Sequence, residues 1–302
     1  MRPPYFVKFT RYSSLFCGLI LSLGTVYAEP IKIVTWNLEW LTSSPNHRFS
    51  QSERTKEDFD TLTKYANRMS PGIVAFQEVN DVNAIKKVLG TQYRIILSDR
   101  ASKDYKRHQF KEINQYTGFA VRNDLTTKNH GDLRLASNKS SKLRFATYIS
   151  INISGQEIHL LSVHLKAGCR GKFKNNRSCK LLKQEVNGIN QWIASRARQN
   201  HSFIVLGDFN HNLAYSNDWL YKLAIRGADP EPVLVSANSD AICQVRSTKS
   251  KGELHSYRYL IDHMIASADL ALSEPYQLVY SKPDVLAYQL SDHCPLITKY
   301  LN

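Results

Sequence analysis

The chain has 302 residues, of which 42% are hydrophobic and 11% aromatic, so it can form one large apolar core and is neither fibrous nor disordered. Lysine and arginine outnumber aspartate and glutamate by 40 to 26, which gives a formal charge of +14 at pH 7. This excess of positive charge has to be solvated or matched by an anionic partner, and it does not specify a fold.

The N-terminal segment has the composition of a secretory signal. Basic residues without any acidic residue occupy residues 1–14, the apolar run Leu15–Val26 follows, and Val26-Tyr27-Ala28 offers small residues at the positions that a signal peptidase reads. A membrane anchor is the alternative, but the run is shorter than the roughly 20 residues that cross a bilayer. We therefore predict a signal peptide over residues 1–28, one domain over residues 29–302, export to a periplasm or the medium, and no stable membrane association.

Segments rich in β-branched and aromatic residues, bounded by turn residues, predict strands along the rest of the chain. They are Ile31–Leu38, Ile73–Gln77, Tyr93–Leu97, Gly118–Arg122, Leu143–Ile153, Glu157–Leu165, Phe203–Gly207, Tyr257–Ala266 and Pro295–Tyr300. Glu53–Met69 and Lys180–Gln199 carry apolar residues at helical spacing and predict amphipathic helices. Ser154-Gly155-Gln156 predicts a hairpin turn, which a purely parallel sheet would not contain. The pattern therefore predicts a mixed sheet with helices outside it.

Four cysteines follow residue 28. An even number in an exported chain favours disulfides, and no Cys-x-x-Cys pair suggests zinc. Cys169 and Cys179 flank a polar, basic stretch, so we expect them to pair and to hold that loop. Cys243 and Cys294 are then left for each other, although Cys294 opens an apolar strand and could be an ordinary buried thiol.

Polar residues gather where the predicted strands begin or end. The segments are Thr35-Trp36-Asn37-Leu38-Glu39, Phe76-Gln77-Glu78, Ser162-Val163-His164-Leu165, Gly207-Asp208-Phe209-Asn210, Ile261-Asp262-His263 and Ser291-Asp292-His293-Cys294-Pro295. Any one of them could be a cap or a turn, because Asp, Asn and Gly are ordinary turn formers. Six of them in one chain indicate an active site, since a rigid scaffold presents its chemistry from the ends of its strands.

In order and wording, these six segments resemble the endonuclease/exonuclease/phosphatase family, which includes deoxyribonuclease I-like enzymes, abasic endonucleases, bacterial sphingomyelinases and inositol polyphosphate 5-phosphatases. With its N-terminal segment, the chain resembles a secreted bacterial-type member. The matching segments run from residue 35 to residue 295. The resemblance implies an α/β (α+β) fold, a four-layer sandwich of two packed mixed β-sheets flanked by helices. It also implies metal-assisted phosphoester hydrolysis at one end of that sandwich.

The resemblance further implies a metal site. Glu78 is its principal ligand, supported by Asn37 and Asp292, and Glu39 is an outer-sphere partner. Carboxylates and amides suit hard Mg²⁺, whereas the lack of a Cys or multi-His cluster in the sequence argues against a dedicated zinc site. Mg²⁺ is the expected cofactor, with Mn²⁺ or Ca²⁺ as alternatives.

Catalytic roles follow from the same resemblance. His293 matches the family's catalytic histidine and Asp262 matches the carboxylate that orients it, which fixes the imidazole tautomer and raises its basicity. Asp208 and Asn210 would position the attacking water and a phosphate oxygen. His164 matches a phosphate-binding or proton-donating imidazole.

Two further residues are carried over as substrate contacts. Tyr116 stands where the family commonly has a residue facing the scissile phosphate, and the alternative is a core or hairpin tyrosine. Arg144 alternates with apolar neighbours, as a phosphate clamp would, and the alternative is an exposed strand arginine.

Basic residues concentrate in residues 100–111 and 166–183, and aromatic residues alternate with the charges there. Lys172, Lys174 and Arg177 belong to the second segment. Such a footprint suits a nucleic-acid backbone, whereas a solvated loop face is the alternative. We therefore predict a secreted, monomeric, metal-dependent phosphodiesterase that binds nucleic acid, most simply an endonuclease that hydrolyses DNA or RNA.

Two other functions stay open at this stage. A sphingomyelinase-like lipid phosphodiesterase would share the metal and the histidines but would need an apolar device to enter the lipid interface, and no short loop clusters Trp or Phe. A non-catalytic secreted protein that binds anions or nucleic acid would usually have lost a metal carboxylate or the histidine, yet Glu78, Asp208, Asp292 and His293 are all present.

Overall fold

The computed structural model describes residues 1, 4–5, 29–136, 138, 141–247, 250 and 252–301. Most of the predicted signal peptide, namely residues 2–3 and 6–28, lies outside the described residues. Within the described part, no helix is both long and apolar enough to cross a membrane.

The first strand after the N-terminal segment lies in the middle of a six-stranded sheet with the order β13-β14-β1-β2-β4-β3. In that order the strands span Tyr276–Gln277, Leu296–Tyr300, Ile31–Leu41, Ile73–Val79, Tyr116–Arg122 and Tyr93–Leu97. β1 and β2 pair in parallel and all other neighbours pair antiparallel. The sheet is therefore mixed, as predicted.

A second six-stranded sheet has the order β5-β6-β7-β8-β12-β9. Its strands span Thr126–Asn129, Thr147–Ile153, Gln156–His164, Ser202–Asp208, Asp262–Ala266 and Val233–Leu234. Only β7 and β8 pair in parallel. The predicted hairpin joins β6 to β7 through Ser154 and Gly155, whose φ values of 51° and 89° suit a two-residue turn.

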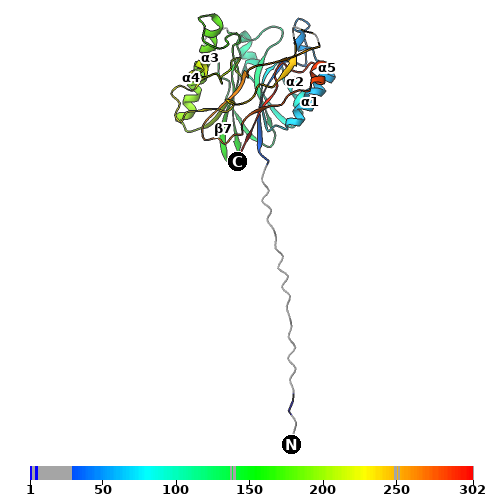
Figure 1. Ribbon diagram of the computed structural model, residues 1–302, viewed down its shortest axis with the longest axis vertical. Coiled ribbons are helices and arrows are strands. Elements are labelled where there is room, and N and C mark those ends of the chain that lie inside the picture. The colour runs from blue at the N-terminus through cyan, green and yellow to red at the C-terminus, as the bar shows by residue number, and fades with distance from the viewer. Residues whose placement is uncertain are drawn as a thin grey trace.

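Helices cover the outer face of each sheet (Figure 1). The first sheet packs against α1 (Lys56–Met69), α2 (Val82–Leu89) and α5 (Lys282–Ala287), and the second packs against α3 (Arg177–Arg198) and α4 (Trp219–Ile225). Apolar side chains of both sheets, among them Ile33, Phe119, Leu160 and Ile204, fill the layer between them. The predicted four-layer sandwich is confirmed.

The two long helices begin three residues away from the starts that the apolar periodicity predicts, because local hydrogen bonds fix their first residues. α1 begins at Lys56 because Thr55 and Asp58 form a capping box, in which each side chain accepts the backbone N–H of the other residue. α3 begins at Arg177 because the Asn176 side chain accepts the N–H of Cys179 at 2.9 Å.

Several short elements escape the sequence pattern. Residues 257–261 are not strand, and the two-stranded hairpin of β10 (Gln244–Arg246) and β11 (Leu254–Ser256) precedes them. The 3₁₀ helices η1 (Ser50–Ser52), η2 (Asp99–Ala101) and η3 (Lys103–His108), like α2, α4 and α5, are at most eight residues long. Elements this short contain too few turns for a periodic pattern of apolar residues to be recognised in the sequence.

Both predicted disulfides are present. Cys169 pairs with Cys179 at a Cα–Cα distance of 4.9 Å, and Cys243 pairs with Cys294 at 5.6 Å. The first bridge closes the basic loop between β7 and α3. The second joins the segment before β10 to the residue that follows His293.

His263, which the sequence leaves without a motif role, is a fully buried structural histidine in β12. The N–H of Leu213 donates to its Nε2 at 3.1 Å, the Leu260 carbonyl oxygen lies 3.2 Å from the same nitrogen, and Nδ1 lies 2.9 Å from the Ser236 hydroxyl. Burial lowers the pKa of this imidazole to about 3. The ring is therefore neutral in the folded protein.

We predict that the His263 imidazole makes folding sensitive to acid. Its folded pKa lies below the ordinary value of about 6.5, so the unfolded chain binds the extra proton as the pH falls from about 6.5 towards 3. The free energy of unfolding should fall through that window, by up to about 1.4 kcal/mol per pH unit from this group. Urea unfolding at pH 7 and pH 5 should show a smaller loss for His263→Gln than for the parent. Equal losses would contradict this account.

Candidate active site

Three neighbouring strands of the second sheet bring polar side chains into one row. His164 ends β7, Asp208 ends β8 and Asp262 begins β12, and the pairing aligns His164 with Asp208 and Asp208 with Asp262. All three residues are buried. A Cβ on Gly207 would lie 2.0 Å from the Val163 carbonyl oxygen, so only glycine allows β7 and β8 to approach so closely just before Asp208.

The first sheet adds Asn37 from β1 and Glu78 from β2. Asn37 Nδ2 lies 3.3 Å from Glu78 Oε1 and 3.1 Å from Asp208 Oδ2, so one amide joins carboxylates of both sheets. Asn37 Oδ1 accepts the N–H of Glu39, and Glu78 Oε2 accepts the N–H of Trp40. Glu39, Trp40 and Glu78 have φ values of 41°, 54° and 57°, a left-handed conformation that is strained in non-glycine residues and clusters at functional sites.

His293 lies in the loop between α5 and β14 and reaches the same row. Its Nδ1 is 2.7 Å from Asp262 Oδ2, and its Nε2 is 3.9 Å from Asp208 Oδ2. The Ser291 hydroxyl donates to the Asn37 carbonyl at 2.7 Å and accepts the His293 N–H at 3.1 Å. The predicted His293–Asp262 pair is therefore assembled, and its loop is bonded to β1.

The backbone after His293 is anchored as well. The Tyr280 hydroxyl donates to the His293 carbonyl at 2.9 Å and accepts the Trp36 indole N–H at 2.8 Å. The Cys243–Cys294 disulfide follows directly. Contacts on both sides of His293 thus fix the position of its imidazole.

His164 faces the carboxylates from the other side. Its Nε2 lies 3.5 Å from both Glu78 Oε1 and Asp208 Oδ2, and its buried Nδ1 has no hydrogen-bond partner among the described residues. Burial, the Arg144 guanidinium and His293 hold the pKa of His164 well below its usual value. His164 is therefore a neutral imidazole, whereas His293 is charged, because the Asp262 carboxylate outweighs burial and raises the pKa of His293 well above its usual value.

The carboxyl groups crowd one another in this low-dielectric site. Burial and the Asp292 carboxylate raise the pKa of Glu39 to about 8. Burial raises the pKa of Asp208 to about 7, although His293 opposes the shift, and it raises the pKa of Glu78 as well. Each of these groups would gain from a nearby positive charge.

The expected metal ligands are only partly brought together. Glu78 and Asn37 are adjacent, but the Asp292 side chain is 47% exposed. Asp292 Oδ1 lies 3.9 Å from His293 Nε2. The Asp292 backbone N–H instead donates to Glu39 Oε2 at 3.1 Å. Among the residues that the structure describes, no three His, Cys, Asp or Glu side chains form a ready-made metal cage. The donors nevertheless suit a hard divalent cation, since they are oxygens and their carboxyl groups are buried.

Asn210, Arg144 and Tyr116 lie around this cluster. The Asn210 N–H and side chain donate to the two Asp208 oxygens at 2.7 and 3.1 Å, and both Asn210 and Arg144 donate to the Leu165 carbonyl. Tyr116 is only 5% exposed, and the Arg100 guanidinium lies 4.8 Å from the centre of its ring. The structure thus places Tyr116 in the buried setting of the core alternative.

Most cations of the two basic segments are exposed, but Arg100 is buried. Lys172 and Lys174 are exposed in the loop that the Cys169–Cys179 bridge closes, Arg177 is exposed at the start of α3, and none of the three forms an ion pair within the described part of the chain. Arg100, which the sequence groups with the surface cations, is fully buried and donates to backbone carbonyls. Its inclusion in a phosphate-binding face is wrong, because its guanidinium already satisfies buried carbonyls.

Two supporting residues escape the sequence analysis. The Arg54 guanidinium donates to the carbonyls of Leu38, Glu39, Gln289 and Leu290, which ties the end of β1 to the loop before Asp292. No local pattern signals this role. Glu185 is buried in α3 and accepts the Lys166 N–H at 2.8 Å; an acidic residue on an apolar helix face is a signal that could have revealed it.

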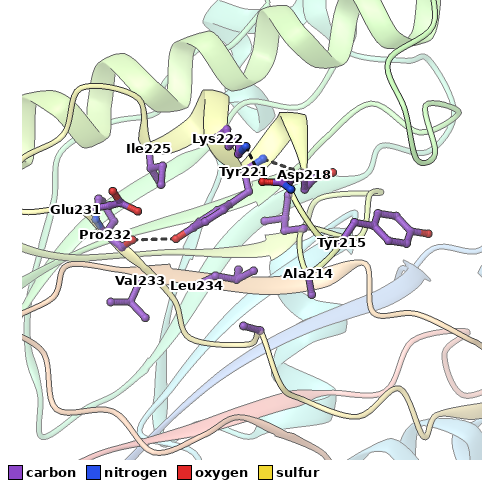
Figure 2. Close-up of a pocket in the computed structure, with 13 residues that line it drawn as sticks. Ala214, Tyr215, Asp218, Tyr221, Lys222, Ile225, Glu231, Pro232, Val233 and Leu234 are labelled. Atoms are coloured by element: carbon purple, nitrogen blue, oxygen red, sulfur yellow. Dashed lines mark hydrogen bonds between the residues drawn. The ribbon is translucent and has the colours of Figure 1, made fainter.

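A separate hollow lies between α4 and the segment around β9 (Figure 2). It has a volume of about 590 Å³, and its lining includes Tyr215, Tyr221 and Val233. The Tyr221 hydroxyl crosses it to donate to the Pro232 carbonyl at 2.9 Å. None of the site residues predicted from the sequence lines this hollow.

Solved structures share the fold across most of the chain. An endonuclease/exonuclease/phosphatase from Bacteroides vulgatus is 16% identical with a TM-score of 0.62, over 91% of this chain and 99% of that one. The mannosyl-6-phosphatase of Bacteroides thetaiotaomicron is 13% identical with a TM-score of 0.61, over 90% and 100%. TDP2 of D. rerio, complexed with a single-strand DNA product, is 15% identical with a TM-score of 0.59, over 91% and 100%.

At the level of sequence, no curated protein matches the chain. The sequence profile of the Endonuclease/Exonuclease/phosphatase family, however, matches residues 34–293, which include every segment of the candidate site up to His293. The chain therefore belongs to the endonuclease/exonuclease/phosphatase family, whose members are phosphoric-ester hydrolases.

Proposed function

We propose that this chain is a secreted, divalent-metal-dependent phosphodiesterase that cleaves nucleic acid, most simply as an endonuclease. One observation carries the proposal: Asn37 and Glu78 of the first sheet, with His293 from the loop before β14, meet three residues of the second sheet, which are His164, Asp208 and Asp262. Phosphodiester hydrolysis needs a positioned water, neutralised phosphate oxygens and a proton for the leaving alkoxide. This cluster offers groups for each need.

Glu78 and Asn37 are the residues that would hold Mg²⁺, with Asp292 at the edge of the same cluster and Glu39 bonded to the Asp292 N–H as an outer partner. Mn²⁺ or Ca²⁺ would use the same oxygen donors. When bound, such an ion supplies positive charge to the non-bridging phosphate oxygens.

The remaining residues divide the handling of water and protons. Asp262 holds His293 Nδ1, which leaves Nε2 to exchange a proton on the side that faces Asp208. Asp208, fixed by Asn210, would orient the attacking water. The neutral His164 imidazole would donate a hydrogen bond to a phosphate oxygen, with Arg144 as the adjacent positive charge.

Nucleic acid is the proposed substrate because the free cations Lys172, Lys174 and Arg177 lie in the loop that follows His164 and at the first residue of α3. Tyr116 remains a candidate contact only if substrate reaches its buried ring. The fold neighbours include both a DNA-bound protein and a sugar phosphatase, so the fold alone does not choose a substrate. The two disulfides favour an oxidising compartment, which agrees with the proposed export. We propose that the protein acts there as a monomer.

We expect Glu78→Gln and Asp292→Asn each to abolish metal-dependent hydrolysis while the fold survives, because a hard divalent ion prefers charged oxygen ligands. The assay is nicking of supercoiled plasmid, with linear DNA, RNA and sphingomyelin in parallel, with and without chelator. Glu231→Gln, an exposed carboxylate outside the cluster, is the matched control. Activity near the parent's in either site variant would mean that the residue is not a metal ligand. Selective turnover of sphingomyelin would mean that the substrate is a lipid and not a nucleic acid.

His293→Ala should lower kcat by at least about 10²–10⁴-fold, the usual contribution of a general acid or base, with little change in KM. Asp262→Asn should lower kcat by less, since it leaves the imidazole in place but removes the carboxylate that orients it. Steady-state kinetics with methyl p-nitrophenyl phosphate measure both. An unchanged kcat in His293→Ala would contradict the proposed mechanism. A higher KM with a normal kcat would show that His293 contributes to substrate binding and not to the chemical step.

Replacing Lys172, Lys174 and Arg177 with Gln should weaken DNA binding and flatten its dependence on salt. Each phosphate contact contributes about 0.9 to the slope of log K against log salt for duplex DNA, so the slope should fall by up to about 3. A control triple variant of the exposed Lys86, Lys128 and Arg198 should keep the parent's slope. Equal slopes for the parent and the loop variant would mean that the loop cations are only solvated.

A further inference from the structure

A groove of about 620 Å³ adjoins the candidate active site. Glu39 and Asp292 line the end that meets the site, the β10–β11 hairpin and residues 288–291 form its walls, and Arg170 reaches it from the Cys169–Cys179 loop. This volume lies within the range of roughly 300–1,000 Å³ that is typical of small-ligand sites. We name this feature the hairpin groove.

Two links hold the walls of the hairpin groove together. The Arg246 guanidinium on β10 donates to the carbonyls of Val285 and Tyr288 at 3.0 and 3.1 Å. The Cys243–Cys294 disulfide joins the residue before β10 to the residue that follows His293. The groove therefore exists before any ligand arrives, which lowers the ordering cost of binding.

Aromatic rings line the hairpin side of the groove. His255 in β11 and Tyr257 just after it meet edge to face, with ring centroids 5.0 Å apart. Tyr257 is 36% exposed, so part of its ring is open to a ligand. An ordinary tyrosine phenol is uncharged at neutral pH. A neutral aromatic face at the edge of a phosphoester site suits the stacking of a base.

Arg170 supplies the complementary charge. It is exposed and has no hydrogen bond or ion pair among the described residues, and its charge acts on the Tyr257 hydroxyl across the groove. A free guanidinium is a strong donor to phosphate oxygens. A stacking ring and a phosphate donor thus line one groove that ends at the carboxylates of the site.

We propose that the hairpin groove holds one unstacked nucleoside next to the scissile phosphate, with its base against Tyr257 and the neighbouring phosphate against Arg170. This inference rests on the proposed phosphodiesterase function and narrows its substrate. A base within a duplex is paired and stacked, so it has to be extruded before it can enter such a groove. The groove therefore selects single-stranded nucleic acid over duplex.

Binding in the presence of EDTA tests the groove apart from catalysis. Fluorescence anisotropy of a labelled 12-nucleotide single strand and of its duplex should show tighter binding of the single strand by the full mature chain. Tyr257→Ala should weaken single-strand binding by about 5- to 100-fold, the range for loss of one base–aromatic stack, while Tyr257→Phe should retain it. Arg170→Gln should also weaken it, and Arg198→Gln, an exposed arginine at the far end of α3, should not.

A competition experiment separates the contribution of the base to binding from the contribution of the phosphate. Adenosine 5′-monophosphate should displace the labelled strand at concentrations at least tenfold lower than ribose 5-phosphate, because the two differ only in the base that stacks. Equal competition by the two compounds, equal affinity for single strand and duplex, or an unchanged affinity in Tyr257→Ala would each overturn the proposal.

Hydrolysis of methyl p-nitrophenyl phosphate with Mg²⁺ is measured on the same preparation. Selective single-strand binding without any hydrolysis would support the groove and contradict the proposed function. Chelator-sensitive hydrolysis without single-strand selectivity would support the function and contradict the groove.

Discussion

The structure depends on one electrostatic constraint, the burial of several acidic side chains at one end of a β-sandwich. Glu78, Asp208 and Asp262 lose most of their water, and an isolated carboxylate in such a setting would take up a proton or force the site apart. The Asn37 amide, the N–H groups of Trp40 and Asn210, and the His293 imidazole satisfy part of this demand. The remaining demand for positive charge supports the proposed divalent cation, and a bound cation would in turn attract the negatively charged phosphate group.

Much of the surrounding fold serves to hold these groups against their mutual repulsion. Glu39, Trp40 and Glu78 have a left-handed backbone, and in this arrangement the Glu39 N–H donates to Asn37 Oδ1 and the Trp40 N–H donates to the Glu78 carboxylate. Gly207 allows β7 and β8 to bring His164 beside Asp208, and Arg54 ties the end of β1 to the loop before Asp292. The Cys243–Cys294 bridge then links that loop to the β10–β11 hairpin, and Tyr257, just after the hairpin, lines the groove. The proposed catalytic site and the proposed substrate groove thus share one set of anchors.

The sequence predicts the elements that repeat a local pattern and the polar residues that end them. Long strands such as β1 and β7, the helices α1 and α3 and both disulfides could be read from alternation, spacing and cysteine count. The contacts that define the site could not be derived that way, because Asn37 meets Asp208, and Arg54 meets Leu290, across well over a hundred residues of chain. The sequence also could not predict which basic side chains are exposed. Arg100 and Lys172 both stand in basic segments, yet Arg100 donates to buried backbone carbonyls and Lys172 is free at the surface. The short β10–β11 hairpin, and with it the groove, leaves no periodic signal.

The central claim is that the buried carboxylate cluster around Glu78 is a divalent-cation site. Calorimetric titration of Mn²⁺ into metal-free protein tests it without any assumption about substrate, because it counts ions directly. The account predicts one saturable site per chain in the parent and its loss in Glu78→Gln, with both chains folded by circular dichroism. Saturable binding of equal strength in the two chains, or no saturable binding in the parent, would contradict it.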